Sequence, residues 1–153
     1  MHIYHAAMLI ALEAHGDARN KHDNELYILH LARVYINVCE ASALHVELAI
    51  AWLHDILEDT DMTIDELRSA LLTYCPEEYN LIQGIVAAVD CLTKKKGESN
   101  ETYYHRVKMN PHARFVKLNG DLVDNFRRNH NIQDETTRLR MAKKYSLGMD
   151  ILT

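Results

Sequence analysis

The sequence predicts an all-α fold, and three observations support this prediction. Five glycines and two prolines among 153 residues are too few for the turns of an all-β domain. Apolar residues recur at helical spacing almost throughout the chain. Helix-start signals divide it, among them a capping box from Thr63 to Glu66 and a proline, Pro76, suited to a helix's first turn. We expect a single compact domain over residues 1–153 with a sizeable core.

The first half of the chain predicts five helical segments. Ile3, Ala7, Ile10 and Ala11 have the spacing of one buried helix face. The polar residues after Gly16 predict a long loop. In order, we expect a first helix ending near Gly16, a loop over 16–25, a second helix over about 26–38, a third over about 43–57, a fourth from Thr63 and a fifth from Pro76.

The second half predicts a loop followed by three helical stretches. The run Lys94-Lys95-Lys96-Gly97-Glu98-Ser99-Asn100 is the clearest loop. A short helix over about 101–109 should end at Asn110-Pro111, because the residue before a proline avoids the helical region. We expect 112–128 to be helical except at Asn119-Gly120, and a final helix over about 134–151. No repeat and no linker divides the chain.

Composition excludes several classes of function. The formal net charge of −5 disfavours a duplex nucleic-acid binder, since such proteins replace counterions with basic stripes. No apolar run reaches the length of a membrane span. Three scattered cysteines indicate reduced thiols and a cytoplasmic protein. The ten histidines exceed ordinary usage and direct attention to a metal site.

The strongest local signal is the segment His54-Asp55-Ile56-Leu57-Glu58-Asp59. On one helix, His54 would lie one turn before Glu58, and Asp55 one turn before Asp59. An imidazole and a carboxylate could then hold a metal while a second carboxylate pair handles a proton. The alternative is a solvated acidic helix end with an exposed histidine.

Two further polar residues lie in apolar helical stretches. His30 follows Tyr27-Ile28-Leu29, where a lone histidine is more often a hydrogen-bonded core residue than a ligand. Asp121 lies in the stretch after Val116, and a buried carboxylate is costly unless it is paired or bound to a metal. Lys117, four residues before Asp121, offers an ordinary ion pair instead.

Taken in order along the chain, these segments form a pattern. Its parts are Ala14-His15, Lys21, Tyr27-Ile28-Leu29-His30, His54-Asp55, Glu58-Asp59, Leu92-Thr93-Lys94, residues 103–107 and 110–114, Lys117-Leu118, Asp121 and Asn125. The pattern resembles the HD superfamily of metal-dependent phosphohydrolases, which are compact helical bundles. Within it, the chain is most similar to the hydrolase domain of the RelA/SpoT enzymes and to the small alarmone hydrolases.

The resemblance implies roles for particular side chains. It implies one divalent metal ion, manganese in most of the family, held by four ligands: His30, His54, Asp55 and Asp121. Glu58 and Asp59 would orient or deprotonate the attacking water. The resemblance also implies substrate contacts, from Lys21 to phosphate and from Asn125 to the nucleoside. Arg106 is a further phosphate candidate, and a plain surface cation is the alternative.

The chain departs from the family pattern at three places. Asn119-Gly120 adds one residue before Asp121, so Asp124 competes for the role of the last ligand. The basic loop reads Arg19-Asn20-Lys21, where the family has adjacent arginine and lysine. Leu31 follows His30 where a proline is usual. Mixed nitrogen and oxygen ligands suit manganese, zinc or iron.

These residues support several hypotheses of function. The first is hydrolysis of a small-molecule nucleotide, with the 3′-pyrophosphate of a (p)ppGpp-type alarmone as the favoured bond. The second is an HD-type nucleotidase or deoxynucleoside triphosphate phosphohydrolase. A two-metal HD oxygenase would need extra ligands such as His105 and His112, and a non-catalytic nucleotide-binding module would use the same pocket. The sequence does not reveal the oligomeric state.

Overall fold

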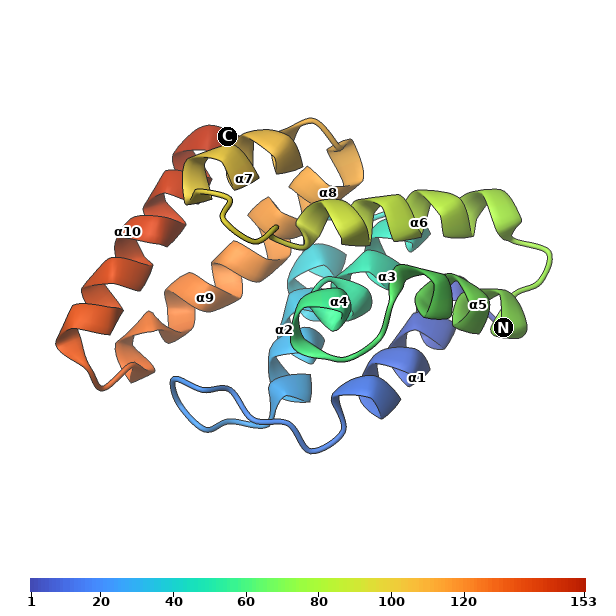
Figure 1. Cartoon of the computed structure of the whole chain (residues 1–153), viewed down its shortest axis with the longest axis horizontal. Helices are drawn as coiled ribbons and strands as arrows, with labels where there is room; N and C mark the ends of the chain where they lie inside the picture. Colours follow the sequence, from blue (N-terminus) through green and yellow to red (C-terminus); the bar gives the residue numbers. More distant parts are fainter.

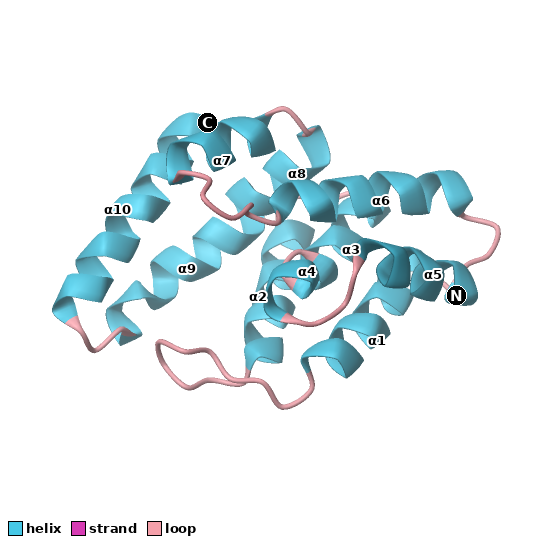
Figure 2. Cartoon of the chain, viewed as in Figure 1, coloured by secondary structure: helices cyan, strands magenta, loops and turns pink.

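The computed structural model describes all residues, 1–153, and consists of helices joined by loops (Figures 1 and 2). The predicted all-α fold is confirmed, with an isolated β-bridge between Arg19 and Leu26 as the one strand-like contact. The elements are α1 (Ile3–His15), α2 (Tyr27–Glu40), α3 (His45–Leu53), α4 (Ile56–Asp59), α5 (Ile64–Tyr74), α6 (Tyr79–Leu92), α7 (Asn100–Lys108), α8 (Pro111–Val116), the π turn η1 (Lys117–Asp121), α9 (Leu122–Arg128), the 3₁₀ turn η2 (Asn129–Asn131) and α10 (Glu135–Leu152).

Helix α3 lies at the centre of the molecule, in contact with α1, α2, α6 and α8 (Figure 1). Its sequence is apolar on nearly every side, which is the pattern of a helix surrounded by others. Six of its apolar residues are buried: Val46, Ala49, Ile50, Ala51, Trp52 and Leu53. His54 and Asp55 directly follow this buried helix, so their position is fixed by the core.

The predicted helix over 43–57 is wrong in its continuity, because the chain breaks between α3 and α4 at His54-Asp55. The Nδ1–H of His54 donates to the carbonyl of Ala51 at 2.7 Å. That carbonyl is the one the Asp55 amide would use in a regular helix, so the side chain competes with the backbone. Asp55 then takes φ −105° and ψ 2°, and α4 restarts with Asp55 as its N-cap.

The predicted start of the fifth helix at Pro76 is also displaced, since α6 begins at Tyr79. The amide of Glu78 donates to the carbonyl of Cys75 at 3.1 Å. This bond places Pro76 in the second position of a β-turn, where its fixed φ is equally suitable. By contrast, the capping box at Thr63 is present, with hydrogen bonds in both directions between Thr63 and Glu66.

Residues 111–128 form one continuous rod, α8–η1–α9, and the expected interruption at Asn119-Gly120 is a π turn within it. A π turn accommodates one extra residue without ending the helix. Gly120 permits the close approach of this turn to α2, because a Cβ there would lie 2.8 Å from the Cγ1 atoms of Val34 and Val38. The buried Asn37 donates to the Gly120 carbonyl at 3.2 Å. The additional residue is therefore absorbed where the rod crosses α2.

Side-chain caps mark the starts of α7 and α10. Ser99 accepts from the Thr102 amide before α7, and Asp134 accepts from the Thr137 amide before α10. Helix α10 packs against α7 and α9, at the side of the molecule away from α5 and α6 (Figure 1). None of the helices combines the length and the apolar character that crossing a membrane requires.

Candidate metal centre

Four side chains from three separate parts of the chain meet in the interior: His30 from α2, His54 and Asp55 from the α3–α4 break, and Asp121 from the end of η1. The Nε2 atom of His30 lies 3.0 Å from Asp121 Oδ1 and 3.6 Å from Asp55 Oδ2. The Nε2 atom of His54 lies 2.9 Å from Asp55 Oδ2 and 3.4 Å from Asp121 Oδ1. Two imidazoles thus face two carboxylates.

These separations match those between ligands of one small cation. Atoms about 2.1 Å from one ion are about 3.0 Å apart at right angles and about 3.4 Å apart at tetrahedral angles. The Nε2 atom of His54 is buried and makes no hydrogen bond, although Asp55 Oδ2 is near. The donor atoms present therefore fit a divalent metal.

The orientation of each imidazole is fixed by a hydrogen bond at Nδ1, on the side of the ring away from the cluster. Because a carbonyl only accepts, the bond to Ala51 places a proton on His54 Nδ1 and directs Nε2 toward the cluster. His30 Nδ1 donates to Asp124 Oδ2 at 2.7 Å, which directs His30 Nε2 in the same way. Metal-binding histidines are usually held by such contacts.

The geometry distinguishes Asp121 from Asp124. Asp121 presents Oδ1 to both histidines, while its Oδ2 accepts from Lys117 Nζ at 2.6 Å. Asp124 lies on the far side of the His30 ring and bonds to Arg33. Asp121 can therefore bind a metal through one oxygen while the other oxygen stays paired with Lys117.

The carboxylates of Asp55 and Asp121 lie close together in the cluster, and their negative charges are stabilised only by positive groups nearby. Burial alone would lower the pKa of His54, but the Asp55 and Asp121 carboxylates outweigh it and raise that pKa to about 10. Burial would raise the pKa of Asp121, but Lys117 and the two histidines hold it well below its usual range. A bound cation satisfies the same carboxylates that otherwise retain protons on the imidazoles.

Two more carboxylates lie at the mouth of the cluster. Asp55, Glu58 and Asp59 each present an oxygen within 4.8 Å of the others. Burial, together with the Asp55 and Glu58 charges, raises the pKa of Asp59 to about 6. Tyr27 donates to Asp55 Oδ2 at 2.5 Å, and Glu58 accepts from the Lys94 amide at 3.0 Å. The pair predicted from sequence is thus beside the cluster.

An open pocket of about 540 Å³ lies over these groups. Lys21 and Asn125, the two predicted substrate contacts, both line it, and Asn125 also donates to Asp121 Oδ1 at 3.2 Å. The pocket has further basic residues that sequence reasoning did not assign: Arg19, Lys94, Arg140 and Lys144. The pattern of segments contained Lys94, and Lys143-Lys144-Tyr145 in α10 resembles a Lys-Tyr segment of the family. Cations near a helix end are usually only favourable partners of the helix dipole, so the sequence assigned Lys144 no role in the site.

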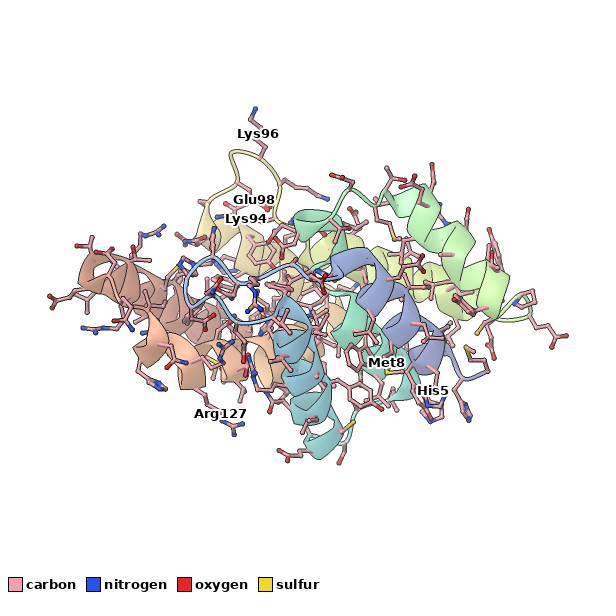
Figure 3. All side chains as sticks on the ribbon, turned by 90° about the horizontal axis from the view of Figure 1, so that it is seen from below. His5, Met8, Lys94, Lys96, Glu98 and Arg127 are labelled. Carbon is pink, nitrogen blue, oxygen red and sulfur yellow. The ribbon has the colours of Figure 1, made fainter.

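Arg106 does not line the pocket. Its guanidinium donates to Glu98 from Nε and Nη2, both at 2.9 Å, and to the carbonyls of Cys91 and Thr93. The structure therefore gives Arg106 a different place from the predicted phosphate contact: it holds the loop that carries Lys94. In Figure 3, Lys94 and Glu98 lie on this loop while Lys96 projects from its tip.

The histidines that a two-metal oxygenase would need lie elsewhere. His105 is exposed on α7, and His112 contacts Glu47 at 3.1 Å. Neither lines the pocket. The structure does not bring them to the cluster, which argues against the oxygenase hypothesis.

Comparison with known proteins finds relatives among both sequences and solved structures, while no family model matches the chain. The chain is 29% identical over 137 residues to a guanosine-3′,5′-bis(diphosphate) 3′-pyrophosphohydrolase of Aquifex aeolicus (strain VF5). That match covers 88% of this chain but 18% of the relative, so the chain spans less than a fifth of the curated protein's length.

The second relative is a solved structure of a metazoan ortholog of SpoT, described as hydrolysing ppGpp and acting in starvation responses. It superposes with a TM-score of 0.76 at 19% sequence identity, over 99% of this chain and 86% of that one. The chain therefore has the helical HD fold and resembles the RelA/SpoT hydrolase domain in both sequence and structure.

Proposed function

We propose that the chain is a metal-dependent phosphohydrolase that removes the 3′-pyrophosphate of a (p)ppGpp-type alarmone. The observation that carries the proposal is the cluster of His30, His54, Asp55 and Asp121 at the floor of a basic pocket. Both relatives are described as hydrolases of this class of nucleotide. The proposal treats residues 1–153 as one HD domain.

One divalent cation is the proposed cofactor, with His30, His54, Asp55 and Asp121 as its ligands. It would supply Lewis-acid stabilisation of the charge that develops on a phosphoryl group. Manganese is the metal we propose, in line with the resemblance, and the mixed nitrogen and oxygen donors are compatible with it. Asp124 is assigned to the orientation of His30 and not to metal binding.

Glu58 and Asp59 are the proposed proton-handling groups. They lie on α4, one turn from the cluster, so they can orient a water molecule against a phosphorus atom at the pocket floor and take its proton. The Lys94 amide fixes one oxygen of Glu58. Glu58 and Asp59 both line the pocket, where a substrate can reach them.

The distribution of positive charge supports a substrate with more than one phosphate group. Arg19 and Lys21 reach the pocket from the loop between α1 and α2, whereas Arg140 and Lys144 reach it from α10. A nucleotide with phosphates at both the 3′ and 5′ positions can use both sets. Asn125, beside Asp121, is the proposed contact to the nucleoside.

A nucleotide panel tests the proposal. The protein, supplied with Mn²⁺, is incubated separately with ppGpp, nucleoside monophosphates, deoxynucleoside triphosphates and GDP. We expect release of pyrophosphate from ppGpp, with GDP as the second product. Phosphate release from monophosphates alone, or tripolyphosphate release from deoxynucleoside triphosphates, would instead support the alternative HD nucleotidases, and no turnover of any substrate would contradict the proposal.

The proposal places the protein in the cytoplasm. All three cysteines are free thiols, and Cys75 is buried, which accords with a reducing compartment.

A further inference from the structure

Arg33 joins two parts of the site that are far apart in sequence. It lies on α2, three residues after His30 and outside the pocket lining. Its Nε donates to Asp124 Oδ1 at 2.6 Å, while Nη1 and Nη2 donate to the two oxygens of Glu25 at 2.8 and 2.7 Å. One planar guanidinium thus binds two carboxylates in fixed directions.

The first of these contacts acts on the metal cluster. Asp124 is 3% exposed; its Oδ1 accepts from Arg33 Nε, and its Oδ2 accepts from His30 Nδ1 at 2.7 Å and from Arg33 Nη2 at 3.3 Å. A carboxylate held only by His30 would be free to turn about its side-chain torsion. Because Arg33 holds the other oxygen, the direction in which His30 presents Nε2 depends on Arg33.

The second contact acts on the loop over residues 16–26. Glu25 lies near its end, its carbonyl accepts from the Asn20 amide at 2.7 Å, and its carboxylate also receives Arg128 Nη1 at 2.5 Å. Arg19 and Lys21 extend from this loop into the pocket. Glu25, together with Asp23, which is also ion-paired with Arg128, therefore anchors the loop that carries these cations.

We propose that Arg33 is a positioning residue that orients His30 through Asp124 and places the basic loop through Glu25. The metal cluster and the cations that contact phosphate then keep a fixed position relative to each other. This inference rests on the proposed function for the identity of the ligands. Arg127, from the neighbouring helix α9, projects outward and donates to Asn37 instead (Figure 3). Arg33 differs from it in having both carboxylates as partners.

Three variants separate the two contacts. Arg33→Gln removes both, Asp124→Asn weakens the contact to His30, and Glu25→Gln weakens the contact to the loop. Arg68→Gln is the matched control, because Arg68 is 31% exposed against 33% for Arg33 and is also ion-paired, to Asp65. Arg68 lies on α5 and does not line the pocket.

Two measurements on the metal-free protein provide readouts besides activity. Calorimetric titration with Mn²⁺ reports on the cluster, and the rate of trypsin cleavage after Arg19 and Lys21 reports on the loop. We expect Arg33→Gln and Asp124→Asn to weaken Mn²⁺ binding by about 10–100-fold, the usual effect of removing a contact behind a ligand. Glu25→Gln should leave Mn²⁺ binding within about two-fold, in line with additivity of separate sites.

The rate of trypsin cleavage should separate the same variants in the opposite way, with Glu25→Gln affected and Asp124→Asn unaffected. Arg33→Gln and Glu25→Gln should be cleaved in the loop several times faster than the wild type, whereas Asp124→Asn and Arg68→Gln should not, because cleavage follows local opening. If Arg33→Gln matches Arg68→Gln in both measurements, or if all three variants change both equally, the inference is overturned.

Failure of the wild type to bind any divalent cation would overturn the proposed function and the His30 contact together. Normal Mn²⁺ binding and ppGpp hydrolysis by Arg33→Gln would overturn the inference alone.

Discussion

The molecule contains two groups of clustered histidines, and only one has the properties of a metal centre. His30 and His54 have ring centroids 5.4 Å apart, and on the surface His2 lies 5.8 Å from both His5 and His45. The surface rings are exposed and contact Tyr4, His2 by stacking and His5 and His45 edge-on (His5 is at the surface in Figure 3). Similar ring spacing thus occurs in very different surroundings.

The difference lies in the partners of the imidazoles. Behind each buried ring, an acceptor holds Nδ1, and in front of it two carboxylates face Nε2. The surface rings have aromatic neighbours, and no carboxylate forms an ion pair with them. Histidine number alone therefore does not identify a metal site. Burial, opposing charge and a fixed tautomer do.

The largest expected effect comes from Asp121→Asn. The change removes a negative ligand and leaves the Lys117 ammonium, which is 12% exposed, without its charged partner. We expect Mn²⁺ affinity to fall by more than about 100-fold and ppGpp hydrolysis to be lost, since even contacts behind a ligand are worth about 10–100-fold. His45→Asn, in the surface cluster, is the control and should change neither. A loss of metal affinity in the His45 variant would make the two clusters equivalent and contradict the comparison.

A second expected effect separates proton handling from metal binding. Glu58→Gln combined with Asp59→Asn should reduce turnover by about 10²–10⁴-fold, the usual contribution of a general acid or base. Mn²⁺ affinity should remain near that of the wild type, as measured by titration. Glu101→Gln, an exposed acid at the start of α7, should leave turnover unchanged. Unaltered turnover in the double variant would show that the carboxylates beside the cluster take no part in the reaction.

A third expected effect concerns stability at the π turn. Gly120→Ala should destabilise the fold by about 1–3 kcal/mol, because its Cβ would meet Val34 and Val38 at 2.8 Å. Gly84→Ala is the matched control on α6, where nothing lies within 4 Å of an added Cβ. There, alanine should stabilise by up to about 1 kcal/mol through its higher helix propensity. Urea denaturation measures both, and equal effects would show that the contact of η1 with α2 is not tight.

The smallest expected effect is a pH dependence of the loop that carries Lys94. Hydrogen bonds from Arg106 lower the pKa of Glu98 to about 2. A lowered carboxyl pKa stabilises the folded state above the ordinary value of about 4.5 and loses that contribution as pH falls toward about 2. The Tm of Glu98→Gln should therefore be lower than that of the wild type at pH 7, and the two values should converge near pH 2. A Tm difference that is constant with pH would contradict the assignment.

Local sequence patterns are sufficient to predict most of the helices of this fold. Caps and apolar periodicity predicted the helices well, because both act within a few residues. The break at His54-Asp55 was not predicted, since it depends on an imidazole competing for the Ala51 carbonyl. Pro76 suits a helix start and a turn equally well, and only packing decides between them.

In the candidate site, too, some features depend on tertiary contacts that the sequence pattern does not contain. The choice between Asp121 and Asp124 depends on the phase of the helix after η1, which an inserted residue shifts and the sequence alone does not fix. Arg106 and Arg140 are both basic helix residues, yet one is satisfied internally by Glu98 and the other reaches the pocket. Which cations are free to meet a substrate is a property of tertiary contacts.

Metal stoichiometry is the most direct test of the central claim, that four side chains hold one divalent ion. The purified protein is loaded with Mn²⁺, desalted and analysed for metal, alongside His54→Asn and His45→Asn. The account predicts one ion per chain in the wild type and in the His45 variant, and a large loss in the His54 variant. Equal metal content in all three proteins, or none in the wild type, would contradict it.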